Sequence, residues 1–158
     1  MHEDNSAGLG ELLNLWQIRR LKHRYVNMLD DRASPEELAS LFTEDGIWSG
    51  PDGYGHHEGR EQLIPFFKRL SSNALFTIHM VGNEVIDVTG DAAHGRWSTI
   101  APCTFLADDK GQDFWGFLRY EDDFVRIKGQ WLFKQILAVP MAGGPHTSGW
   151  GGSVPVKS

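Results

Sequence analysis

The stretch RYVNMLDDRASPEELASLFTEDGIWSG, residues 24–50, joins the end of one predicted helix to a second helix and then to a strand. Ser34 can accept a hydrogen bond from an unpaired backbone N–H, and Pro35 suits the first position of a helix. The two glutamates that follow complement the positive end of the helix dipole. We therefore predict a helix that starts at Ser34 and ends near Phe42, followed by a short strand over residues 46–50.

Two longer helices are predicted on either side of this stretch. Residues 8–30 carry apolar residues near helical spacing, with charged residues on much of the remaining face. A third helix is predicted over residues 60–72, and because Pro65 removes a hydrogen bond beyond the first turn, we expect it to start nearer Gln62. Between them, turn-forming residues make 51–59 a loop. The one cluster of basic residues is expected on the exposed face of the first helix: Arg19, Arg20, Lys22 and Arg24.

After Asn73 the apolar pattern changes from helical spacing to alternation. Four long strands are predicted, joined by short connections of the hairpin type. Helices followed by an antiparallel meander predict an α+β fold, with the helices packed on one face of a curved sheet. The four strand candidates are FTIHMVGNEVIDVTG (76–90), AAHGRWSTIAPCTFLAD (92–108), QDFWGFLRYEDDFVRIKG (112–129) and QWLFKQILAVPMAG (130–143).

The chain of 158 residues fits one domain that is large enough to fold without disulfides or metals. We place this domain over residues 1–142. Residues 143–158 are rich in Gly and Pro and are expected to form an irregular tail, with Trp150 as its candidate docking residue.

Composition and charge argue against several kinds of partner. The net charge of −6 and the scattered basic residues do not supply the basic stripe that nucleic-acid binders need. The single cysteine, Cys103, cannot form an intramolecular disulfide, which favours a reducing compartment. The polar first residues do not resemble a signal peptide, and no apolar run approaches the length of a membrane span. We expect a soluble, cytoplasmic protein with no nucleic-acid or membrane partner.

The chain resembles the SnoaL-like branch of the NTF2-like superfamily, whose members fold as a cystatin-like cone. The stretches that carry the resemblance are residues 24–50, HEGREQLIPFF, IHMVGNEVIDVTGDAAHGRWS and DFWGFLRYEDDFVRIKGQWLFKQI. It covers about residues 10–140 and is nearest the group with scytalone dehydratase, bile acid 7α-dehydratase and hexachlorocyclohexane dehydrochlorinase. The resemblance implies three N-terminal helices packed on a curved antiparallel sheet. Because the superfamily includes enzymes, binders and subunits of complexes, the fold alone does not fix the function.

The resemblance also implies roles for particular residues. In this group an aspartate at the end of the first helix and a histidine on the first long strand act as a dyad, and the matching residues are Asp30 and His79. A polar residue five positions before the aspartate often assists, which matches Tyr25. The aromatic lining that follows the second helix in relatives falls on Trp48 or Tyr54.

The sequence departs from its relatives at two places on the sheet. Several relatives have a cavity arginine on the last strands, where this chain has Lys134, Gln135 and Ile136. Scytalone dehydratase has a second histidine further along the sheet, for which His94 is the sole counterpart, at a shorter spacing. We include His94 and Trp115 as candidate substrate contacts.

The residues themselves leave simpler interpretations open. A lone histidine in an apolar strand is more often a structural core residue, and the acidic pair Asp30 and Asp31 is typical of a solvated helix end. A carboxylate that accepts from one imidazole nitrogen, however, fixes the tautomer and leaves the other nitrogen as a base near neutral pH. Tyr25 lies about 140° from Asp30 on an ideal helix, so the two share a cavity only if the helix ends or distorts near Asp30. Tyr25 is otherwise a core aromatic with its hydroxyl at the rim.

No metal site or cofactor is predicted. His56, His57 and Glu58 have no second group of ligands in the sequence, and adjacent side chains rarely converge on one ion. We expect them at the mouth of the cavity. Cys103 has no identified partner that would make it a nucleophile.

These observations predict a cofactor-independent lyase of the dehydratase type that acts on a small apolar ring compound, such as a steroid, polyketide or aromatic metabolite. Two alternatives stay open: an isomerase or cyclase that uses the same dyad, and a non-catalytic ligand binder or small subunit. Since relatives usually associate through their sheets, we expect a homodimer or homotrimer.

Overall fold

Three helices and seven strands make up the part of the chain that the computed structural model describes, residues 5–51, 53–107 and 110–146. The helices are α1 (Asn5–Asp30), α2 (Pro35–Ser40) and α3 (Arg60–Asn73). The strands are β1 (Phe42–Ser49), β2 (His56–Glu58), β3 (Ala74–Thr77), β4 (Met80–Thr89), β5 (Ala92–Ala107), β6 (Lys110–Ile127) and β7 (Gln130–Pro145).

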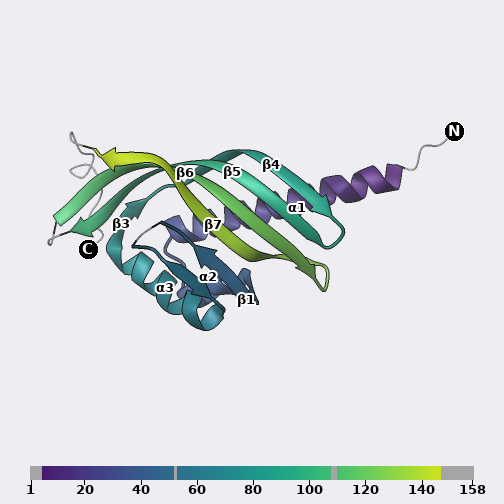
Figure 1. Ribbon diagram of the computed structural model, residues 1–158, viewed down its shortest axis with the longest axis horizontal. Helices are drawn as coiled ribbons and strands as arrows, with labels where there is room; N and C mark the ends of the chain where they lie inside the picture. Colours follow the sequence, from purple (N-terminus) through teal and green to yellow (C-terminus); the bar gives the residue numbers. More distant parts are fainter. Residues whose placement is uncertain (1–4, 52, 108–109, 147–158) are drawn as a thin grey trace.

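All seven strands belong to one sheet, in which β2, β1, β7, β6, β5 and β3 follow one another and β4 also pairs with β5. The long strands β5, β6 and β7 bend over the helices, which lie on the concave side of the sheet (Figure 1). This is the α+β cone that the sequence predicts. The sheet is mixed rather than purely antiparallel, because β1 runs parallel to β7.

The predicted strand 76–90 is two strands in the structure. Both β3 and β4 pair with β5, but the ladder breaks between Thr77, which faces Cys103, and Met80, which faces Ile100. Pro102 lies opposite the break and has no N–H to donate to a ladder there, which explains the interruption. The backbone N–H of Ile78 still donates to the carbonyl of Pro102. Successive N–H groups of a strand point to opposite sides, so the N–H of His79 points away from β5 and can bind a side chain.

The two shorter helices begin where their local sequence directs. The Ser34 side chain accepts a hydrogen bond from the backbone N–H of Glu37, and the Glu37 side chain accepts one from the backbone N–H of Ser34. The capping box of α2 is therefore complete. The helix α2 ends at Ser40, before the predicted Phe42, because β1 begins there. The prediction that α3 starts near Gln62 is wrong. Gly59, with a φ of 77°, turns the chain so that the helix begins at Arg60, and Pro65 lies inside it.

The core lies between the helices and the concave face of the sheet. An aromatic cluster forms its centre, with Tyr25 from α1 packed against Phe42, Phe67 and Phe133. The first turns of α1 project beyond the sheet (Figure 1). Several apolar residues in and just after these turns are exposed instead of buried: Leu9, Leu12, Leu13 and Trp16.

The last strand extends further than predicted. Residues 143–145 belong to β7 and not to an irregular tail. The rest of that predicted tail, with Trp150, lies outside the described residues from 147 onward. No helix in the described ranges combines the length and the apolar character needed to cross a bilayer.

Candidate active site

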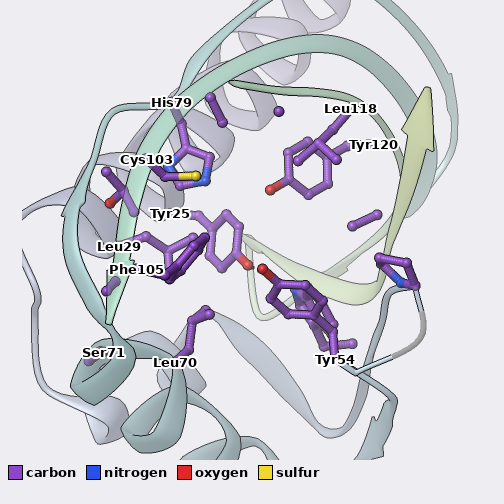
Figure 2. Close-up of a pocket in the computed structure, with 17 residues that line it drawn as sticks. Tyr25, Leu29, Tyr54, Leu70, Ser71, His79, Cys103, Phe105, Leu118 and Tyr120 are labelled. Carbon is purple, nitrogen blue, oxygen red and sulfur yellow. Dashed lines mark hydrogen bonds between the residues drawn. The ribbon is translucent and has the colours of Figure 1, made fainter. Parts of the chain in front are cut away.

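A cavity of about 150 Å³ opens on the concave side of the sheet, between α1, α3 and the bent strands (Figure 2). Most of its wall is apolar, with contributions from Leu29, Leu70, Phe105 and Leu118. Its polar groups are the side chains of Tyr25, Trp48, Tyr54, Ser71, Thr77, His79, Cys103 and Tyr120. None of the described lining residues is charged.

Asp30 and His79 meet at the edge of this cavity. The Nδ1 atom of His79 donates to Oδ1 of Asp30 over 2.6 Å, and the backbone N–H of His79 donates to Oδ2 over 2.8 Å. The Thr77 hydroxyl adds a third bond to Oδ1, at 3.0 Å. Both side chains are largely buried, with 13% of His79 and 17% of Asp30 exposed. One carboxylate thus holds the ring and the backbone of the histidine together.

The arrangement leaves Nε2 of His79 available at the cavity. A carboxylate can only accept hydrogen bonds, so Nδ1 carries the proton and Nε2 of the neutral ring keeps its lone pair. Nε2 has no hydrogen-bond partner in the described ranges. His79 lines the cavity, whereas Asp30 lies behind it and is absent from the wall (Figure 2). The geometry is that of a base with an orienting carboxylate.

The end of α1 determines which acidic residue takes this place. The helix ends at Asp30, and the chain then turns through Arg32, whose φ is 55°. The N–H of Ala33 binds back to the carbonyl of Met28 and closes this turn. Asp31 is left exposed at the surface. Because α1 ends at Asp30, Tyr25 and the dyad can border one cavity despite their angular separation along the helix.

Tyr25 is fully buried and lies at the base of the cavity. Its hydroxyl oxygen accepts a hydrogen bond from Nε1 of Trp48 over 2.9 Å. Burial raises the pKa of Tyr25 well above its ordinary value. The phenol therefore keeps its proton, and with its oxygen already accepting from Trp48, that proton can be donated to a bound molecule.

Two further tyrosines border the same space (Figure 2). Tyr54, from the loop before β2, was predicted from the sequence, and Tyr120, on β6, was not. Burial raises the pKa of both tyrosines, and it raises the pKa of the Cys103 thiol to about 11. All three groups stay protonated near neutral pH. The cavity therefore presents neutral donors opposite one base.

Two of the predicted substrate contacts are corrected by the structure. His94 lies on the outer, convex face of the sheet, because its neighbours Ala93 and Gly95 face inward and side chains alternate along a strand. Its ring binds Asp123 at 2.8 Å and Glu121 at 3.2 Å.

Trp115 also points outward. It is 37% exposed, and its Nε1 donates to Nδ1 of His146 over 3.3 Å. The cavity wall at this point is formed by its neighbour Gly116. Neither His94 nor Trp115 is among the described residues that line the cavity.

The residues predicted at the cavity mouth lie beside it, on β2. His56 binds the Ser49 hydroxyl, and His57 binds the carbonyl of Tyr54 and stacks on Phe66. Within the described ranges, no group of three or more His, Cys, Asp or Glu side chains is arranged to hold a metal ion. Where several relatives have a cavity arginine, Lys134 forms an ion pair with Asp45 at the surface.

A buried ion pair that the sequence did not predict lies behind the cavity wall. Lys22 Nζ is 2.8 Å from Oδ2 of Asp122, and both side chains are fully buried. The contact is a close ion pair whose angles lie outside those of a directed hydrogen bond. Lys22 was expected on the exposed face of α1, so the structure corrects that prediction. Burial lowers the pKa of Lys22 and raises the pKa of Asp122 to about 6.

Comparisons with known proteins give one family and one fold for most of the chain. The profile of the SnoaL-like domain family matches residues 10–136. Rv2910c, an uncharacterized protein of Mycobacterium tuberculosis, is 30% identical over 130 residues, which are 78% of this chain and 82% of that protein. An uncharacterized protein of Mycobacterium bovis, Mb2934c, matches to the same extent.

Solved structures with the same fold include two proteins from Novosphingobium. A candidate scytalone dehydratase from Novosphingobium aromaticivorans is 26% identical, with a TM-score of 0.77 over 86% of this chain and 89% of that one. A hexachlorocyclohexane dehydrochlorinase, LinA-type3, from Novosphingobium barchaimii is 20% identical, with a TM-score of 0.77 over 87% of this chain and 93% of that one. The second likeness concerns the fold alone.

Proposed function

This chain belongs to the SnoaL-like domain family, and we propose that it is a cofactor-independent lyase of the dehydratase type. A candidate dehydratase and a dehydrochlorinase have the same fold. The observation that carries the proposal is the pair of Asp30 and His79. Its Nδ1–Oδ1 distance is 2.6 Å, and Nε2 is left free at an apolar cavity. A base of this kind is what an elimination requires.

In the proposed reaction, Nε2 of His79 removes a proton from a carbon next to a carbonyl group. The electron pair of the broken C–H bond forms the new double bond, and a hydroxyl group on the adjacent carbon leaves. The imidazolium returns its proton to the departing hydroxyl, so that water is lost and the enzyme is unchanged. Asp30 stabilises the imidazolium in between. Tyr25 donates a hydrogen bond to an oxygen of the substrate, in surroundings from which water is excluded.

The size and polarity of the cavity support a small, uncharged ring compound as the substrate. A cavity of about 150 Å³ with apolar walls is known to bind benzene, and the cavity here has about that volume. Of the substrate classes expected from the sequence, an aromatic or polyketide metabolite of one ring fits this volume better than a steroid does. With no charged side chain in the described wall, a neutral hydroxy-carbonyl compound is favoured.

The dyad is tested by following the imidazole nitrogen NMR signals of His79 in the wild type and in Asp30→Ala. The carboxylate holds the proton of the neutral ring on Nδ1, so the fraction of this tautomer should fall when the carboxylate is removed. His94 is a built-in control, because it binds other carboxylates on the convex face. An unchanged tautomer of His79 would contradict the dyad and would favour a ligand-binding role.

The reaction is tested by incubating the protein with ring hydroxy-carbonyl compounds and following the loss of water by mass spectrometry. His79→Gln should lower turnover by about 10²–10⁴-fold, the usual contribution of a general base. The matched variant His94→Gln should leave turnover unchanged. Equal rates in the two variants would remove the proposed role of His79.

An isomerase that uses the same dyad is the second candidate, and one observation favours it. The donors that border the cavity are phenols whose pKa values are raised by burial. Phenols of this kind suit hydrogen bonding to a carbonyl oxygen better than protonation of a leaving group. Product of unchanged mass, with a shifted double bond, would identify the isomerase.

A further inference from the structure

The buried pair of Lys22 and Asp122 needs an explanation beyond folding. Both side chains are fully buried, and Lys22 Nζ lies 2.8 Å from Oδ2 of Asp122. In the described ranges, no directed hydrogen bond reaches the ammonium or the carboxylate. Such pairs often contribute less to stability than apolar side chains of the same size. Their position is therefore more informative than their energy.

The ammonium of Lys22 is surrounded by aromatic ring faces. Nζ lies 3.5 Å from the centre of the Tyr120 ring, 5.3 Å from that of Tyr25 and 5.8 Å from that of Phe133. Attraction between a cation and a ring face holds the closest of these rings, Tyr120, in place. Two of the three rings belong to tyrosines that line the cavity. The positive charge thus lies directly behind the cavity wall.

Tyr120 presents a hydroxyl that nothing in the described ranges satisfies. The residue is 3% exposed, and its side chain points into the cavity (Figure 2). No hydrogen bond joins its hydroxyl to another described residue. Since buried polar groups are nearly always paired, this hydroxyl is available for a bound molecule.

We propose that Tyr120 is a second hydrogen-bond donor to an oxygen of the bound ring compound, and that Lys22 and Asp122 are positioning residues that hold its ring. The ligand class is a ring compound with a carbonyl, enolate or phenolate oxygen. In the reaction, that oxygen is the carbonyl next to the carbon that His79 deprotonates, and this part of the proposal rests on the proposed function.

The pKa of Tyr120 fits the role of a hydrogen-bond donor. Burial and the carboxylate of Asp122 both raise this pKa. Tyr120 consequently remains a neutral donor in the empty site. A hydrogen bond to a charged oxygen is stronger than one to a neutral oxygen, so the effect grows as the substrate approaches its enolate.

The test uses 4-nitrophenol, a single-ring probe whose phenol and phenolate forms absorb at different wavelengths. It is carried out in a His79→Gln background, so the result does not depend on the proposed base. Adding Tyr120→Phe should lower the ratio of phenolate to phenol affinity by roughly tenfold, the order expected for a hydrogen bond to a charged group.

The buried pair is tested by adding Lys22→Met and Asp122→Leu together, which removes both charges and leaves no unpaired group. The same ratio should again fall by several-fold to roughly tenfold, with the far-UV circular dichroism unchanged. Trp115→Phe, on the convex face, is the matched control and should leave the ratio unchanged. Because Lys22→Met alone leaves a buried carboxylate unpaired, the charge-free variant is the decisive one.

Two results would overturn the proposal. An unchanged ratio in folded Tyr120→Phe would show that this hydroxyl does not contact the probe oxygen. A fall in Tyr120→Phe with no change in the charge-free variant would refute the role of Lys22 and Asp122. Both results are independent of the NMR test of His79, so the proposed function can fail while this proposal holds, and the reverse.

Discussion

Removing one charge of the buried pair should destabilise the protein far more than removing both. Lys22→Met leaves the carboxylate of Asp122 fully buried without a cation 2.8 Å away. Leaving one member of a buried pair uncompensated costs about 3–5 kcal/mol of unfolding free energy. Replacing both with apolar residues of similar size, as in Lys22→Met with Asp122→Leu, is often neutral or stabilising. We therefore expect the unfolding free energy of the double variant to lie within about 1 kcal/mol of that of the wild type.

The penalty for Lys22→Met should depend on pH, and its sign follows from Asp122. Burial raises the pKa of this carboxyl from 3.8 to about 6 even with Lys22 present, and loss of Lys22 removes an influence that lowers it. A carboxyl whose pKa is raised on folding contributes most to stability below its unfolded pKa, and that contribution is lost as pH rises through the folded value. Lys22→Met should therefore be less destabilised at pH 5 than at pH 8.

Urea denaturation of the wild type, both single variants and the double variant gives the four corners of a thermodynamic cycle. The m-values should agree, so that differences in midpoint report differences in stability. Additive single effects, or a cost below about 1 kcal/mol for Lys22→Met, would mean that water reaches the lysine and that the pair is not buried in solution.

Other features of the structure give two smaller predictions. Thr77→Val removes one of the three hydrogen bonds to Asp30, so the unfolding free energy measured in urea should fall by about 0.5–1.5 kcal/mol while both hydrogen bonds from His79 to Asp30 are kept. A larger loss would show that Thr77 does more than support Asp30. In an NMR titration, the pKa of His94 should lie above 6.5, mainly because of its hydrogen bond to Asp123. This pKa should drop in Asp123→Asn. The stability that the His94–Asp123 pair contributes is present below pH 6.5 and is lost as pH rises through the raised pKa of His94. An unchanged pKa of His94 in Asp123→Asn would refute the pairing.

The dyad could be predicted from the sequence because the family pattern fixes two positions far apart in the chain. Spacing alone would not have paired Asp30 with His79, since 49 residues separate them. The break between β3 and β4 was not predicted, because its cause, Pro102, lies on the neighbouring strand. Contacts between strands are decided by register, which a single sequence specifies weakly.

The buried lysine could have been found from the phase of α1. Lys22 lies four residues after Ile18 and three before Tyr25, which places it within the buried face of the helix. The exposed residues Leu9 and Trp16 lie about 180° from this face at 100° per residue. Together the two apolar sets resemble a single stripe, and the basic neighbours of Lys22 favour a solvated side.

The errors at His94 and Trp115 have a similar origin. Inward and outward positions alternate with a period of two, so a one-residue shift in phase exchanges the two faces of a strand. Tyr120 is on the inward phase of β6 together with Leu118. The homodimer or homotrimer, the cytoplasmic location and the absence of a cofactor stay predictions.

The place of β7 in the sheet also has a consequence for how the chain is made. This strand, from the end of the described chain, lies between β1 and β6, and Phe42 near the start of the sheet pairs with Phe133. During synthesis, β1 has no neighbour on that side until β7 has left the ribosome. Pairing of such distant segments closes long loops and slows folding. The aromatic core, and the cavity floor that rests on it, should therefore form only after β7 has been synthesised.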